Sequence, residues 1–184
     1  AAQDVANAEA GILQFERQEV DLVGIIDAAV AGCRPSMDVR NQPFSAQLPG
    51  TAVKLMGDRA RLAQIVGNLL DNAIKYTPDG GEIRLSLEKL DDAAVLTVSD
   101  NGIGITAQAL PDIFEPFAHD IQALGFNGVG RGIGLAAVRA LVKAHGGTVR
   151  ASRKGSILGR RFVVTLALPE GAEAMPAGTP AETV

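Results

Sequence analysis

The chain has 184 residues, a formal net charge of −4 and a hydrophobic fraction of 47%, which is enough for one domain with a sizeable core. The acidic balance, without clustered Lys and Arg, argues against a nucleic-acid-binding protein. The single cysteine, Cys33, excludes an internal disulfide and a CxxC zinc site. No apolar stretch approaches the roughly 20 residues that span a membrane, and no signal peptide is visible. We therefore expect a cytoplasmic domain whose parent protein is either soluble or membrane-anchored.

The first part of the chain predicts two helices and two short strands. Residues 1–18 show apolar residues at helical spacing without an N-cap pattern, which is typical of the end of a longer helix. A second helix is predicted over 21–33, ended by Pro35. Short strands over 44–48 and 52–56 flank a Pro-Gly turn.

The third helix is the best defined in the sequence. Asp58 is a candidate N-cap, and a Thr-Pro-Asp-Gly-Gly run at 77–81 ends the helix. Its apolar stripe has a 3.6-residue period and consists of Leu62, Ile65, Val66, Leu69, Leu70, Ala73 and Ile74. Two strands follow over 83–87 and 94–98, and the second leads directly into Asp100.

The remaining sequence predicts a glycine-rich irregular segment over 105–134 and a helix over 135–144. Strands over 148–152 and 161–168 follow, and the composition from Pro169 onward is typical of a disordered tail. The hairpin-like connections predict a mixed, largely antiparallel sheet with helices on one face, an α/β two-layer sandwich of the α+β type.

Two asparagines, Asn68 and Asn72, lie on the same face of the third helix because they are four residues apart. Asparagine is unfavourable in a helix interior, since its side chain competes for backbone hydrogen bonds. One such residue is usually a surface accident, but here Lys75 and Tyr76 follow one turn later. A neutral amide oxygen suits Mg²⁺, which takes its negative charge from substrate phosphates, and Lys75 would add a positive charge beside them.

Asp100 stands at a strand end, before the Gly-x-Gly sequence of Gly102 and Gly104. The carboxylate is either a turn-former that binds its own backbone or an acceptor for an exocyclic amine such as that of adenine. The two glycines would let the backbone pass close to a flat ring.

A second glycine cluster, at 128–134, opens the helix over 135–144. Backbone N–H groups at a helix start bind anions, and glycines free the backbone to present them. No Gly-Lys dipeptide occurs, which excludes a Walker A loop. The spacing also fails the GxGxxG pattern of dinucleotide-binding turns.

Four ordered segments resemble the ATP-binding catalytic domain of sensor histidine kinases, within the fold family shared with DNA gyrase B, heat-shock protein 90 and MutL. Residues 68–78 resemble that family's asparagine box and residues 100–105 its first glycine box. Residues 113–117 resemble its phenylalanine box and residues 130–135 its second glycine box. The resemblance covers about 20–169, so residues 1–19 are expected to end a dimerisation hairpin and 170–184 to form the tail.

The resemblance implies a role for each matching position. Asn72 would coordinate Mg²⁺, Asn68 and Lys75 would act on the phosphates, and Asp100 would accept from the adenine amino group. Phe114 and Phe117 would anchor a lid over about residues 118–131. The other implied nucleotide contacts are Tyr76, Gly102, Gly104, Ile105, Phe117, Gly130, Arg131, Gly132, Ile133, Gly134, Leu135 and Thr165. Arg131 would either pair with the γ-phosphate or remain a surface charge of the lid.

One position separates the subfamilies that the resemblance covers. Hydrolytic members have a glutamate four residues before the metal-binding asparagine, whereas this chain has Asn68, and an amide cannot act as a general base. Transfer of the γ-phosphoryl group of Mg·ATP to a histidine is therefore expected. The two histidines, His119 and His145, do not lie on the first helix, so the acceptor is expected in a histidine-containing dimerisation domain upstream, with a response regulator receiver domain as the next partner.

Two other functions remain open at this level. The first is a pseudokinase that senses ATP without transferring phosphate. The second is a serine kinase of the anti-sigma-factor type, which Asn68 disfavours. No nucleic acid and no direct membrane contact are expected in any of these cases.

Overall fold

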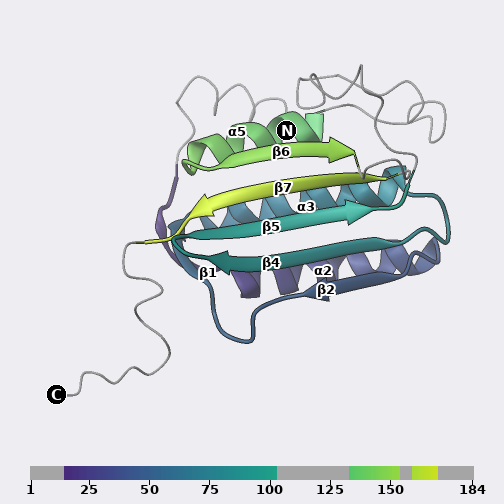
Figure 1. The fold of residues 1–184 in the computed structure, drawn as a ribbon, viewed down its shortest axis with the longest axis horizontal. Coiled ribbons are helices and arrows are strands. Elements are labelled where there is room, and N and C mark those ends of the chain that lie inside the picture. Colours follow the sequence, from purple (N-terminus) through teal and green to yellow (C-terminus); the bar gives the residue numbers. More distant parts are fainter. Residues whose placement is uncertain (1–14, 103–132, 154–158, 170–184) are drawn as a thin grey trace.

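The computed structural model describes residues 15–102, 133–153 and 159–169. Within them a five-stranded sheet forms one layer and three helices form the other, all on one face of the sheet (Figure 1). The expected α/β sandwich is confirmed. No helix in these described ranges combines the length and hydrophobicity needed to cross a bilayer.

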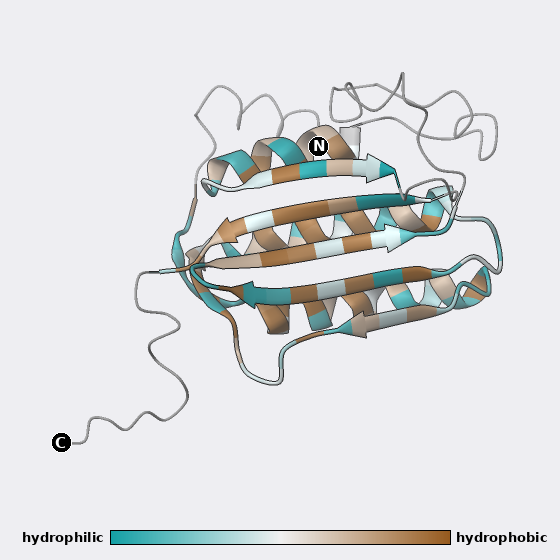
Figure 2. Ribbon diagram, in the orientation of Figure 1, coloured by the Kyte–Doolittle hydropathy of each residue, from teal (hydrophilic) through white to brown (hydrophobic). Residues whose placement is uncertain are grey.

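The main sheet has the strand order β2-β4-β5-β7-β6. Its strands are β2 (Phe44–Gln47), β4 (Ile83–Leu90), β5 (Ala93–Asp100), β6 (Thr148–Arg153) and β7 (Arg160–Ala167). Only the β2–β4 pair is parallel, and the other pairs are antiparallel. Hydrophobic and more polar residues alternate along the central strands (Figure 2), because successive side chains point to opposite faces and one face alone is covered by helices.

The helices are α2 (Leu22–Val39), α3 (Arg59–Tyr76) and α5 (Ile133–Ala144). Every residue of the predicted apolar stripe of α3 is buried. Asp58 is the N-cap, and its carboxylate accepts hydrogen bonds from the amides of Ala60 at 3.0 Å and Arg61 at 3.2 Å. This cap satisfies two of the amides that a helix start leaves unpaired.

The prediction of a helix over 1–18 is wrong for its C-terminal residues, 15–18. Residues 1–14 lie outside the described part of the chain. Residues 15–17 have no regular structure, and Gln18 begins strand β1 (Gln18–Asp21), which pairs with β3 (Lys54–Gly57) in a second, two-stranded sheet. The strand places Val20 in the core opposite Leu55 while its neighbours stay polar. The strands predicted beside the Pro-Gly turn are both present, but they join different sheets.

Pro35 does not end α2, contrary to the sequence prediction. The helix continues to Val39 with Pro35 inside it, although proline removes a hydrogen bond and crowds the preceding turn. The extra turn buries Met37 completely and leads to Gln42, whose Nε2 donates to the carbonyl oxygens of Ile74 at 3.1 Å and Thr77 at 2.8 Å. Tertiary packing at the end of α3 therefore outweighs the local cost of the proline.

His145, directly after α5, links two helices. Its Nδ1 lies 2.9 Å from the carbonyl oxygen of Leu141, and its Nε2 accepts from the amide of Asp58 at 3.2 Å. The ring packs edge-on against Phe15, with centroids 4.8 Å apart. Burial lowers the pKa of His145 below its ordinary value of 6.5, an effect that Arg17 adds to and that the Leu141 carbonyl and Asp58 oppose.

We expect the free energy of unfolding to fall as the pH is lowered from about 7 to about 5. The unfolded chain binds the His145 proton more readily than the folded chain does, so stability present above about pH 6.5 is lost in mild acid. Urea unfolding at several pH values measures this, with His145→Gln as the comparison. The variant should be less stable at pH 7 but should show a shallower slope with pH. Equal slopes in the two proteins would contradict the assignment.

Candidate functional site

The predicted site residues of α3 lie beside the start of α5 and the end of β5. Asn68 and Asn72 are both half-buried on α3, and Nδ2 of Asn68 donates to the carbonyl oxygen of Gly134 at 3.3 Å. Figure 1 shows α3 behind β5 and β7, next to α5. The amide pair predicted from helical spacing therefore lies where three elements meet.

Asn72 carries an acceptor without a donor. Its Oδ1 is buried and has no hydrogen-bond partner among the residues that the structure describes. Such atoms are rare in folded proteins, because an unmade hydrogen bond costs about 1–3 kcal/mol. A neutral oxygen in this state fits a hard metal ion such as Mg²⁺.

Asp100 is the second polar group of the site and is only 2% exposed. Its Oδ1 accepts from the amide of Gly102 at 2.9 Å, which confirms the turn-forming role considered for this residue. Its Oδ2 accepts from Nε and Nη2 of Arg160 at 3.3 and 3.2 Å. The carboxylate is therefore fixed by backbone on one side and by a guanidinium on the other.

Tyr76 and Gly102 close the space between α3 and β5. Tyr76 is buried, and burial raises the pKa of its hydroxyl while the positive charge of Arg160 opposes this effect. A Cβ atom at Gly102 would lie 2.4 Å from the carbonyl oxygen of Tyr76 and 3.1 Å from Oδ1 of Asp100. Only glycine fits this approach of two backbone segments.

Arg160 belongs to the site, although the sequence analysis does not single it out. It is 2% exposed and pairs with Asp100 across β7 and β5. The strand alternation contained the signal: Phe162, Val164 and Leu166 face the helices, so Arg160 must face them as well.

The other predicted site residues have varied surroundings. Lys75 is exposed on α3, and Leu135 is buried in the hydrophobic core. Thr165 shares a strand face with Val163, on the side of the sheet opposite Asp100, so the structure does not bring these two residues together. The predictions outside the described residues concern Gly104, Ile105, Phe114, Phe117, Gly130, Arg131, Gly132 and the lid over 118–131, and nothing is described of the side chain of Ile133.

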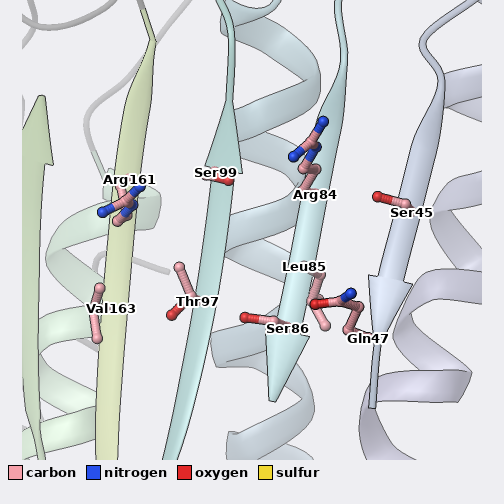
Figure 3. A pocket seen from close by; sticks show the side chains of 9 residues that line it. All are labelled: Ser45, Gln47, Arg84, Leu85, Ser86, Thr97, Ser99, Arg161 and Val163. Atoms are coloured by element: carbon pink, nitrogen blue, oxygen red, sulfur yellow. The ribbon is translucent and has the colours of Figure 1, made fainter. Parts of the chain in front are cut away.

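A shallow pocket of about 570 Å³ lies on the open face of the sheet (Figure 3). The figure shows Ser99 between Arg84 and Arg161, on β5, β4 and β7. The other lining residues are Ser45, Gln47, Leu85, Ser86, Thr97 and Val163. Because Asp100 and Asn72 lie on the helix-covered side, this pocket is separate from the candidate site.

Comparison with known proteins identifies the family. Residues 57–172 match the family described as histidine kinase-, DNA gyrase B- and HSP90-like ATPases. The chain belongs to this family. The match includes α3, β5, α5 and β7, which are all the elements that build the site.

The relatives are sensor histidine kinases. The signal transduction histidine-protein kinase/phosphatase MprB of Mycolicibacterium paratuberculosis is 34% identical over 182 residues, which cover 95% of this chain and 33% of that protein. The structure of a mycobacterial sensor histidine kinase MprB matches with a TM-score of 0.71 and 29% identity, covering 82% of this chain and 97% of that chain. Full-length ShkA in complex with AMPPNP matches with a TM-score of 0.76 and 25% identity, covering 90% of this chain and 34% of that chain.

The chain spans about a third of the length of such curated relatives. It corresponds to the ATP-binding catalytic domain of two-component histidine kinases. The resemblance based on the four sequence boxes is therefore confirmed for the family, the fold and ATP as the nucleotide.

Gly102→Ala is expected to destabilise the domain by about 1–3 kcal/mol, because the new methyl group overlaps the Tyr76 carbonyl. Urea unfolding measures the loss. Gly32→Ala is the matched control: Gly32 is exposed on α2, and a Cβ atom there meets nothing within 4 Å. The control should gain about 0.5–1 kcal/mol, since alanine favours a helix interior. Equal stability of the two variants would contradict the close approach at Gly102.

Proposed function

We propose that this chain binds Mg·ATP and transfers the γ-phosphoryl group to a histidine that lies outside residues 1–184. The observation that carries the proposal is the pair of amides on α3. Oδ1 of Asn72 has no hydrogen-bond partner within the part of the chain that the structure describes, and Nδ2 of Asn68, one turn earlier, donates to the carbonyl oxygen of Gly134 at the start of α5. Neither amide can take a proton from water, which favours transfer over hydrolysis.

Asn72 is the proposed metal ligand, with Oδ1 as the donor atom. Mg²⁺ held there would neutralise the negative charge on the phosphate oxygens during transfer. The exposed Lys75 adds a positive charge one turn further along α3, and the amides at the start of α5 favour a bound phosphate. These residues position and neutralise the triphosphate, which is most of what phosphoryl transfer requires of a protein.

The base is assigned to the neighbourhood of Asp100 and Tyr76. The Asp100 carboxylate would accept a hydrogen bond from the adenine amino group, and Gly102, whose amide donates to Oδ1 of Asp100, helps to hold this carboxylate in place. The ATP analogue in the ShkA structure supports nucleotide binding by this fold at 25% identity. Gly104, Ile105 and the second glycine box remain proposed contacts from the sequence.

The same proposal extends to the surroundings of the domain. Residues 20–169 form the catalytic domain, which acts in the cytoplasm, where ATP is available. The acceptor histidine belongs to a dimerisation domain, so the active assembly is a homodimer, and a response regulator receives the phosphoryl group next. The names of the curated relatives, which are signal-transduction histidine kinases, support these partners.

Asn72→Ala is expected to weaken Mg·ADP binding at least about tenfold, or about 1.4 kcal/mol, because it removes the proposed metal ligand. Isothermal calorimetry with Mg²⁺ and with EDTA measures the metal-dependent part of the affinity. Asp71→Ala, at the exposed neighbouring position of α3, is the control and should bind as the wild type does. Unchanged metal dependence in Asn72→Ala would remove Asn72 from the metal site.

The chain alone is not expected to phosphorylate itself. His145 is held by Leu141 and Asp58 through its two ring nitrogens, so it is not free to attack a phosphate. Incubation with γ-labelled ATP should leave no acid-labile label on the chain. Adding the upstream histidine-containing segment as a separate polypeptide should produce phosphohistidine on that segment. Binding of ATP without any transfer would favour the pseudokinase, and label on His145 would contradict the proposed acceptor.

A further inference from the structure

Arg160 is a charged residue buried at the centre of the proposed site, and its burial is energetically unfavourable. Its guanidinium and the Asp100 carboxylate are 3% and 2% exposed, and they face each other across paired strands at 3.2 Å. Burying two charges costs several kcal/mol, and the attraction between them returns this only in part, so such a pair is weak evidence for a role in stability. A role in the site is therefore the better explanation.

The guanidinium is held from several sides at once. Besides contacting Asp100, Nη2 donates to the carbonyl oxygen of Asn72 at 3.1 Å. Its central carbon lies 4.8 Å from the ring centroid of Tyr76 and 5.5 Å from that of Phe162. Arginine is a planar, rigid fork with donors in fixed directions. Arg160 thus ties the base-reading carboxylate to the turn of α3 that carries the metal ligand.

The contacts of Asp100 limit what its carboxylate can still accept. A carboxylate has about four lone-pair sites. Gly102 N takes one on Oδ1, and Nε and Nη2 of Arg160 take two on Oδ2. The carboxylate is then held against rotation and keeps capacity for about one more donor. Paired with a guanidinium, it accepts hydrogen bonds and does not donate them.

We propose that Arg160 is a positioning residue that sets the choice of purine, by fixing Asp100 as an acceptor for a 6-amino group. The inference rests on the proposed function, because it assigns Asp100 to the base. Adenine brings a donor to the fixed carboxylate. A 6-oxopurine such as hypoxanthine brings an acceptor, so two acceptors would face each other without a proton between them. A site that leaves a buried polar group unpaired rejects a ligand strongly.

The test compares ADP with IDP, whose bases differ at the 6-position, on the full chain with Mg²⁺. Calorimetry gives a dissociation constant for each nucleotide, and their ratio is the readout. Wild-type protein should prefer ADP by at least about tenfold. In Arg160→Met the side-chain length is kept and the fork is lost, so the carboxylate can rotate away from a 6-oxo group and no longer has to face it. The preference should then fall by about tenfold or more.

Arg161→Met is the matched control, because Arg161 is the next residue on β7 and lies exposed on the open face of the sheet (Figure 3). Its ratio should equal that of the wild type. Arg160→Lys keeps a buried cation beside Asp100 but lacks the fork, and is measured as well in case Arg160→Met does not fold. The lysine variant should lose part of the preference, about threefold.

The ratio separates the possible results. If Arg160 had a purely structural role, Arg160→Met and Arg160→Lys would bind ADP and IDP equally more weakly, and the ratio of the dissociation constants would not change. This result would overturn the inference, but the proposal that the wild-type chain binds ATP would stand. Wild-type protein that binds neither nucleotide would instead overturn the proposed function, and this inference with it. A selective loss of the ADP preference in the Arg160 variants supports the inference.

Discussion

The site depends on the placement of α3, which is fixed at both ends by residues remote in the sequence. At its start, Asp58 caps the first turn, and the backbone amide of Asp58 donates a hydrogen bond to Nε2 of His145, directly after α5. At its end, Gln42 binds the carbonyl oxygens that the last turn leaves unpaired. Because the apolar stripe between these ends is buried, the helix can neither slide nor rotate without losing packing. Asn68, Asn72 and Tyr76 therefore project from a rigid support.

Two polar features of the proposed site are costly for stability. Among the described residues, the buried Oδ1 of Asn72 has no hydrogen-bond partner, a state that it shares with Oε1 of Gln42 and Oγ1 of Thr77. Asp100 and Arg160 form a buried ion pair, and the attraction between two buried charges returns only part of the cost of burying them. The proposed ligand would give the Asn72 oxygen a partner and would give the ion pair a role in binding.

Most of the fold and the pair of asparagines on α3 could be predicted from local sequence patterns. The stripe of α3 and the spacing of Asn68 and Asn72 are periodic, so they were recognised without a structure. The failures came where distant contacts outweigh local preference. The helix continues past Pro35 because Met37 is buried in the core and Gln42 binds carbonyl oxygens at the end of α3. Gln18 enters a strand because β3 lies beside it. Arg160 was missed because a charge at a strand start is usually exposed, and only the pairing with Asp100 shows that it is buried. The lid and residues 130–132 of the second glycine box lie outside the described residues, so those expectations stay predictions.

The parallel pairing of β2 with β4 has a consequence for how the domain folds. The chain between these two strands contains α3, so the helix that carries Asn68 and Asn72 is part of the crossover itself. β2 is a short edge strand of four residues, held in the main sheet through β4 alone. Closing so long a connection is entropically costly until the intervening helix packs on the sheet. The edge of the sheet and the helix that carries Asn68 and Asn72 are therefore expected to form together, in one cooperative event.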